Sequence, residues 1–242
     1  MQINLQPIKI PSLKEACITQ LEELILTGEL QMGARLPSER DLAAQLNVSR
    51  PILHEALVDL ESKGLLKITP RHGTRVNDFR RSGSLALLSS LLNYHNGNLD
   101  PHFSNNLIDM RLLIEMETAR LAALHRTPAQ LEEFRDLLQQ EAQTSAEDLE
   151  ALISLDFSFH LLIAIASGNL IYPLIINSFR SVYTSLTGAF FQRISDNLIL
   201  QTVHTYHRQL VDAIERQDAD VCANIMSEML KHGESILKGE LK

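Results

Sequence analysis

The chain has 242 residues, enough for one large domain or two modest ones, and a formal net charge of −8. Its two cysteines, Cys17 and Cys222, are far apart in apolar helical patterns, which excludes a disulfide framework and a CxxC metal site. No uninterrupted apolar run has membrane-spanning length, and residues 1–11 lack the layout of a secretory signal. We therefore expect a soluble, cytoplasmic protein with no membrane partner.

The acidic charge is unevenly distributed. Residues 1–81 hold 11 Lys and Arg against 10 Asp and Glu, whereas residues 82–242 hold 11 against 20. Counterion release from DNA phosphates depends on the local patch and not on the whole-chain charge. The N-terminal third therefore remains suited to nucleic-acid binding.

The chain begins with an expected loose arm over residues 1–10. Ser12 and Glu15 then form a capping box, which predicts a helix with one apolar face running to about Gly28. We expect this helix to pack behind the elements that follow.

The next segment has the spacing of a helix-turn-helix. Ser38 with Asp41 predicts the start of a short helix that ends near Asn47, and Ser49 can cap a second helix with Pro51 in its first turn. Two helices joined by about three residues are typical of this motif.

The second helix leaves four residues near its N-terminus outside its apolar stripe, where a helix-turn-helix reaches base edges. These residues are Arg50, Ile52, His54 and Glu55. After Gly64, two short alternating segments flank a turn over Pro70–Gly73, which predicts a β-wing tipped with Arg71, His72 and Arg75.

At this point the sequence resembles the N-terminal domain of GntR-family transcription regulators. The resemblance covers about residues 8–77 and is carried by Gly33-Ala-Arg-Leu-Pro-Ser-Glu-Arg40, Leu42-Ala43, Val48-Ser-Arg-Pro51, Glu55-Ala-Leu57 and Gly64-Leu65. It implies that Arg40 and Arg50 contact DNA and that His72-Gly73 lies near the minor groove. With the residues argued above, the candidate DNA-binding set is Arg40, Ser49, Arg50, Ile52, His54, His72, Gly73 and Arg75. The family usually has arginine where this chain has His54, which leaves base preference open there.

The domain boundary is expected at the polar stretch 78–84, after a winged helix-turn-helix over residues 1–77. Every later segment, over residues 85–242, is predicted to be helical. Ser145 with Asp148 is expected to cap a helix that ends near Ser167. Leu170–Arg193 is expected to form one long apolar helix, largely buried in a bundle or a subunit interface.

This second half resembles the helical effector-binding domain, of the FCD type, in the FadR-type branch of the same family. The motifs are Arg111 with Glu115, Leu121-Ala-Ala123, Asp156-x-x-Phe159-His160, Gly168-Asn169, and His207 followed by Ala213-Ile214, Asp218 and Met226. The resemblance implies an antiparallel bundle of six or seven helices with a ligand cavity along its axis. The expected fold class is therefore mainly α, with a small β-wing.

Asp156 and His160 are four residues apart, so on a helix both side chains point the same way. With His207 they form a donor set suited to zinc, nickel, manganese or iron. The resemblance places a fourth ligand where this chain has Met229, a poor ligand for a hard ion; His232 or His204 could substitute. Alternatively, Asp156 hydrogen-bonds His160 without a metal, or these groups bind an effector directly.

By the resemblance, Arg111 faces the cavity. A buried guanidinium needs a partner, which is either Glu115 permanently or the carboxylate of an arriving ligand. A hydroxy acid, sugar acid or dicarboxylate could pair with Arg111 and bind the metal ion.

The sequence thus predicts a ligand-responsive transcription regulator, in this family most often a repressor, that binds a palindromic DNA operator as a homodimer. One alternative is a metal-dependent enzyme that uses Asp156, His160 and His207. The chain lacks a nucleophile with a base, a phosphate-binding glycine loop and a cofactor motif, so we expect no enzyme. The other alternative is a DNA-binding dimer without ligand control.

Overall fold

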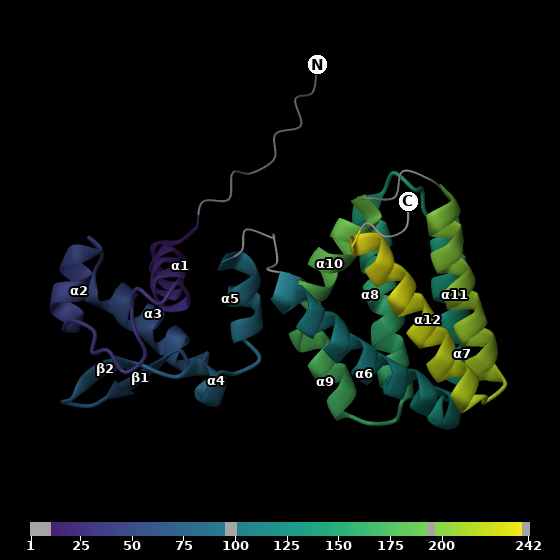
Figure 1. Ribbon diagram of the computed structural model, residues 1–242, viewed down its shortest axis with the longest axis horizontal. Coiled ribbons are helices and arrows are strands. Elements are labelled where there is room, and N and C mark those ends of the chain that lie inside the picture. Colours follow the sequence, from purple (N-terminus) through teal and green to yellow (C-terminus); the bar gives the residue numbers. More distant parts are fainter. Residues whose placement is uncertain (1–10, 95–100, 193–196, 239–242) are drawn as a thin grey trace, which may run out of the picture. The chain divides into compact units, whose positions relative to one another are not determined.

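The computed structural model describes residues 11–94, 101–192 and 197–238 (Figure 1). The chain divides into two compact units, residues 1–98 and 99–242. The expected N-terminal arm and the expected helix end at Arg193 lie outside the described residues.

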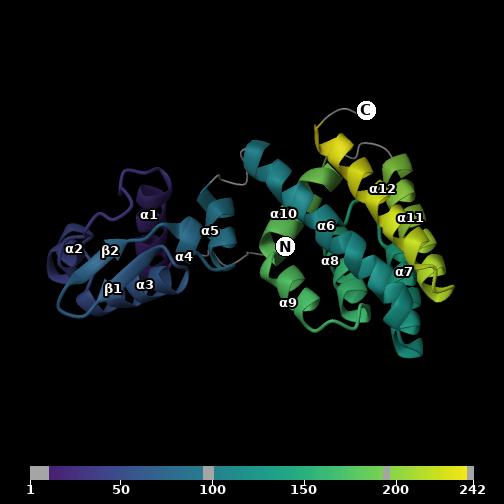
Figure 2. The ribbon, with the colours of Figure 1, turned by 60° about the horizontal axis from the view of Figure 1, so that its bottom comes forward.

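The first unit is a winged helix-turn-helix followed by two further helices (Figures 1 and 2). Its elements are α1 (Leu13–Leu26), α2 (Glu39–Gln45), α3 (Arg50–Ser62), β1 (Leu66–Thr69), β2 (Gly73–Val76), α4 (Phe79–Ser82) and α5 (Leu87–Tyr94). The strands form an antiparallel hairpin in which Leu66 lies opposite Val76 and Thr69 lies opposite Gly73.

Local capping sets the ends of these helices. Ser12 and Glu15 form the predicted capping box on α1, and the Ser38 hydroxyl accepts a hydrogen bond from the Asp41 amide. Ser49 is the N-cap of α3, but its side chain makes no cap hydrogen bond. The apolar faces of α1 and α3 meet in one core, with Leu21, Ile25, Leu53, Leu57 and Leu60 buried.

The helix α5 packs on this unit. Leu87 and Leu91 join the core of the first unit, and the Ser84 amide donates to the Lys63 carbonyl at the end of α3. The compact unit therefore extends beyond the polar stretch 78–84, where the sequence indicated a boundary. Polar residues without periodicity resemble a linker, yet here they form α4 and cap a helix end.

The second unit is an all-helical bundle. It contains α6 (Pro101–His125), α7 (Pro128–Gln143), α8 (Leu149–Ala166), α9 (Ile171–Ser178), α10 (Arg180–Gln192), α11 (Asn197–Glu215) and α12 (Ala219–Lys238). No strand follows β2 in the described ranges, and the predicted mainly α fold with a small β-wing is confirmed.

Two helices differ from expectation. The helix α8 starts at Leu149 with Asp148 as its N-cap, because the Asp148 carboxylate accepts from the Ala151 amide; the Ser145 hydroxyl instead accepts from the Glu147 amide. The prediction of a single long helix over Leu170–Arg193 was wrong, because the helix is interrupted at Phe179 and divides into α9 and α10. Apolar periodicity continues through Phe179 and so gives no signal of the break.

The sequence of the helix α8 is interrupted by Glu150 and Asp156 but is otherwise strongly apolar. It is long and apolar enough to cross a membrane by length and composition, with mean hydropathy 1.8. It packs against α6, α7, α9 and α10, which is the environment of a core helix. It carries Asp156 and His160 into that core.

Candidate functional site

The predicted DNA-contacting residues on α2 and α3 lie at the surface of the first unit. Arg50 is the first residue of α3 and is exposed, and Arg40 on α2 is 80% exposed beside Asp41. His54 lies one turn after Arg50, with Nδ1 3.1 Å from the Glu39 Oε1 atom. Ile52 is half-buried. An exposed helix N-terminus that carries guanidinium groups can bind phosphate oxygens.

The wing presents a second set of exposed basic groups. His72, Gly73 and Arg75 are exposed, and the Arg75 Nη1 atom donates to the Gly33 carbonyl at 3.0 Å. Arg35 pairs with Arg75 through a backbone bridge and places its guanidinium against Gly73. Sequence reasoning did not single out Arg35, although it lies within the quoted Gly33–Arg40 motif.

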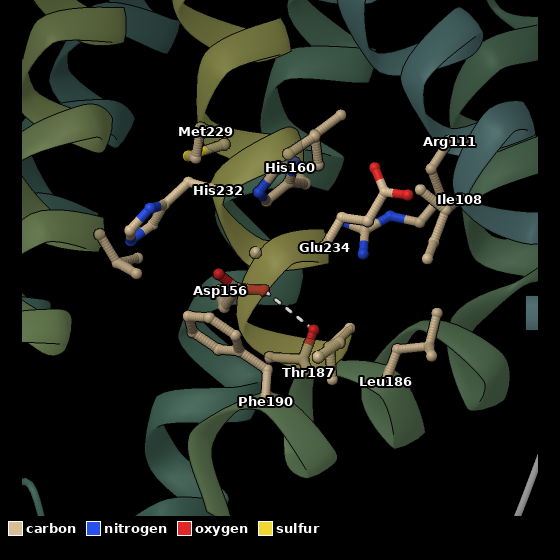
Figure 3. Close-up of a pocket in the computed structure, with 14 residues that line it drawn as sticks. Ile108, Arg111, Asp156, His160, Leu186, Thr187, Phe190, Met229, His232 and Glu234 are labelled. Carbon is tan, nitrogen blue, oxygen red and sulfur yellow. Dashed lines mark hydrogen bonds between the residues drawn. The ribbon is translucent and has the colours of Figure 1, made fainter. Parts of the chain in front are cut away.

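In the second unit, three predicted metal ligands come together. Ligand atoms of Asp156 and His160, both on α8, and of His207 on α11 all lie within 4.8 Å of one another. The Asp156 Oδ1 atom is 3.9 Å from the His207 Nε2 atom. Thr187 on α10 donates to the other carboxylate oxygen of Asp156 at 3.2 Å (Figure 3).

A carboxylate lies behind each histidine. The Glu141 Oε1 atom is 2.6 Å from the His207 Nδ1 atom, and the Glu115 carboxylate contacts the His160 Nδ1 atom. Among the described residues the His207 Nε2 atom is buried with no hydrogen-bond partner. A carboxylate behind one imidazole nitrogen and an unpaired nitrogen in front is the arrangement of a metal-binding histidine.

Charge balance also fits a cation. The carboxylates of Glu115, Glu141 and Asp156 and the guanidinium of Arg111 surround the centre in the described part of the chain. Three carboxylates stand here against one guanidinium, and a divalent ion would balance such an excess of acidic groups. The two-histidine, one-carboxylate set suits a borderline divalent metal ion.

The acidity of Glu115 follows from its neighbours. Burial alone would raise the pKa of Glu115, but Arg111 and His160 outweigh burial and lower it to about 2. The same ion pair raises the pKa of Arg111 despite its burial. Both groups therefore stay charged at neutral pH.

A cavity of about 70 Å³ adjoins this centre, several times the space that one water needs. Arg111, Asp156, His160, Thr187, Met229 and His232 are among the residues that line it (Figure 3). The Arg111 Nε atom donates to Glu115 at 2.6 Å, and the guanidinium stacks 4.0 Å above the Tyr183 ring. The predicted Arg111–Glu115 pair is thus present, and the guanidinium still borders the cavity.

The proposed substitutes for the fourth ligand do not join the centre. Within the described ranges, the cluster of ligand atoms includes neither His204 nor His232. Met229 lines the cavity, where its thioether is a poor ligand for a hard ion. The residues Glu141 and Thr187 were missed by sequence reasoning, since each reaches the centre from a distant helix.

Comparison with known proteins agrees with this architecture. Residues 13–76 match the profile of "Bacterial regulatory proteins, gntR family", and residues 106–232 match the FCD domain. The HTH-type transcriptional regulator Mce2R of Mycobacterium tuberculosis is 32% identical over 249 residues, covering 98% of this chain and 96% of that protein. The HTH-type transcriptional repressor NanR of Escherichia coli is 31% identical over 229 residues, covering 89% and 80%.

Two solved structures share the fold. The Listeria monocytogenes protein Lar, described as controlling expression of the agr system, superimposes with a TM-score of 0.63 at 19% identity, covering 97% of this chain and 100% of that one. Escherichia coli McbR/YncC gives a TM-score of 0.53 at 22% identity, with 96% and 99% coverage.

A winged helix-turn-helix joined to a helical FCD domain defines a DNA-binding transcription regulator. The chain belongs to the GntR family of bacterial regulatory proteins. Members of this family bind DNA and small-molecule effectors, and both relatives are named as transcription regulators, not as enzymes.

Proposed function

We propose that this protein is a cytoplasmic, ligand-responsive repressor that binds a palindromic operator as a homodimer and is released by a small organic anion. The observation that carries ligand control is the cavity beside Asp156, His160 and His207, which is lined by both apolar and charged side chains. Repression is supported by the name of the relative NanR.

The DNA contacts divide between α3 and the wing. Arg50 and His54 would reach base edges in the major groove, and the Ser49 hydroxyl, which makes no cap hydrogen bond, would bind at the helix N-terminus beside the half-buried Ile52. Arg40 would bind phosphate. The wing residues His72, Gly73 and Arg75 would lie near the minor groove.

A homodimer is supported by the apolar surface of α9 and of Leu170, its N-cap residue. Leu170 is 85% exposed, Leu174 61% and Ile171 58%. Large apolar side chains grouped on one short helix are typical of a subunit interface. Two-fold symmetry would present two recognition helices to a palindromic operator.

In the second unit, Asp156, His160 and His207 would hold a zinc, nickel, manganese or iron ion. Such an ion would supply an open position for an effector carboxylate or hydroxyl. Arg111 would pair with the effector carboxylate through guanidinium N–H groups that Glu115 does not use. An effector that binds more tightly to the protein state with weak operator affinity would shift the population toward that state and so lower operator affinity.

A two-part experiment tests this function. A duplex selected by the purified protein from random DNA is titrated by fluorescence anisotropy at fixed salt, with and without organic acids, and bound metal is measured by mass spectrometry. We expect a palindromic site, about one metal ion per chain, and weaker DNA binding when an acid is added. Specific binding that no acid changes would instead indicate a DNA-binding dimer without ligand control.

A further inference from the structure

His232 carries a second unpaired imidazole nitrogen and is one of the residues that line the cavity. It lies on α12 and lines the cavity, and its Nε2 atom is buried with no hydrogen-bond partner among the described residues. A buried polar atom without a partner is unfavourable, so such atoms usually pair with water or a ligand.

The position of His232 separates it from the metal centre. Its nitrogens are not part of the cluster formed by Asp156, His160 and His207 in the described chain. In Figure 3, His232 lies on one side of Asp156 and His160, and Arg111 lies on the other. The cavity is therefore lined by the Arg111 guanidinium on one side of the cluster and by the His232 imidazole on the other.

We propose that His232 determines effector specificity by hydrogen-bonding a second polar group of the effector, whose carboxylate pairs with Arg111. This inference rests on the proposed function, because it assumes an effector in this cavity. It narrows the effector to a bifunctional acid, one that carries a hydroxyl or a second carboxylate away from the group bound at Arg111.

The apolar lining explains why one imidazole would discriminate between acids. Leu186, Phe190 and Val203 line the same cavity and offer no hydrogen-bond donor from their side chains. An acid without a distal polar group leaves the His232 Nε2 atom unpaired. A site built to bind a polar group rejects analogues that lack it far more strongly than an apolar pocket rejects a missing methylene.

Malate and lactate form a matched pair of probes. Both have a 2-hydroxy carboxylate, but malate alone carries a second carboxylate. Isothermal titration calorimetry on the full-length, metal-loaded protein should give at least about tenfold tighter binding of malate than of lactate. In His232→Phe, malate affinity should fall about tenfold to the level of lactate, while lactate affinity and metal content stay unchanged.

Two further variants make the test specific. His232→Gln keeps a hydrogen-bonding group and should recover part of the malate preference. His204→Phe changes a half-buried histidine outside the cavity lining and should leave both affinities unchanged.

Loss of metal in His232→Phe would overturn the inference, because His232 would then be a ligand. Equal losses for malate and lactate, or no loss for either, would also overturn it. If wild-type protein bound neither acid, the proposed effector class and the role of His232 would both fail. Binding of the selected duplex would be unaffected by that result. Failure of the effector proposal can therefore be distinguished from failure of DNA recognition.

Discussion

Gly64, directly after the recognition helix α3, has a backbone conformation that only glycine adopts freely. Its φ is +81°, and a Cβ atom there would lie 1.9 Å from the Ser82 carbonyl oxygen. Neither the left-handed conformation nor the backbone contact can be relieved by a side-chain rotation.

Gly64→Ala should therefore destabilise the first unit by about 2–5 kcal/mol, which combines left-handed strain with overpacking. Gly28→Ala is the matched control: its φ is also +81°, but nothing lies within 4 Å of the added carbon, so about 1 kcal/mol is expected. Hydrogen exchange of the α1 and α3 amides measures the loss of stability in each of the two variants. Equal effects of the two variants would contradict the role of the Ser82 contact.

Glu141 lies behind His207 and is not itself part of the Asp156–His160–His207 cluster. Glu141→Gln removes the charge behind His207 and should weaken binding of a divalent metal about 10–100-fold. Titration against a competing chelator measures this change. The control Glu133→Gln alters an exposed residue on the same helix and should have no effect. Unchanged metal affinity in Glu141→Gln would contradict this prediction and would show that Glu141 only holds His207 in place.

At the scale of elements, α5 is held to the first unit by a small ionic cluster. Lys63 Nζ lies 2.6 Å from the Glu22 carboxylate and donates to Ser90 on α5, and the Ser90 hydroxyl donates to Glu22 at 2.7 Å. Glu22 is only 7% exposed, so its remaining hydrogen bonds matter.

Ser90→Ala should raise the rate of hydrogen exchange in α5, through a loss of about 1–2 kcal/mol, and leave α8 unchanged. Ser84→Ala, which removes the hydroxyl that donates to the Ser62 carbonyl, tests whether the hydrogen bond between residue 84 and the end of α3 also matters. Uniform exchange changes in both units would contradict a local role for the cluster.

The sequence predicted elements where the signal is local. Ser12 with Glu15, and Ser38 with Asp41, mark helix starts because capping needs only residues within one turn. The break at Phe179 and the attachment of α5 were missed because both depend on tertiary packing. Neither the polar stretch before α5 nor the apolar stripe through Phe179 indicates which other elements that segment packs against.

The whole molecule shows the same limit at its candidate site. Asp156 and His160 share one helix face, so their proximity could be predicted from spacing. Glu141 lies 66 residues before His207, and only the fold brings them together. Thr187 and His232 likewise line the cavity, a position that only the folded structure reveals.

Dimerisation belongs to this scale as well. Replacing Leu170 and Leu174 with glutamate places charges on the exposed apolar face of α9 and should convert a dimer to a monomer in sedimentation analysis. The fold should persist, because both side chains are more than half exposed. The control Leu113→Glu changes a residue that is 75% exposed on α6 and should keep the dimer. If the variant with glutamate at positions 170 and 174 remained a dimer, the interface would lie elsewhere.

The most direct test of DNA reading is fluorescence anisotropy of a duplex selected by the wild-type protein, compared with a scrambled duplex at the same salt concentration. The wild-type protein should bind the selected duplex at least about a thousandfold more tightly. Arg50→Ala should bind both duplexes nearly alike while keeping its helical content. Equal wild-type affinity for the two duplexes, or full discrimination by Arg50→Ala, would contradict the assignment of α3 as the DNA-reading element.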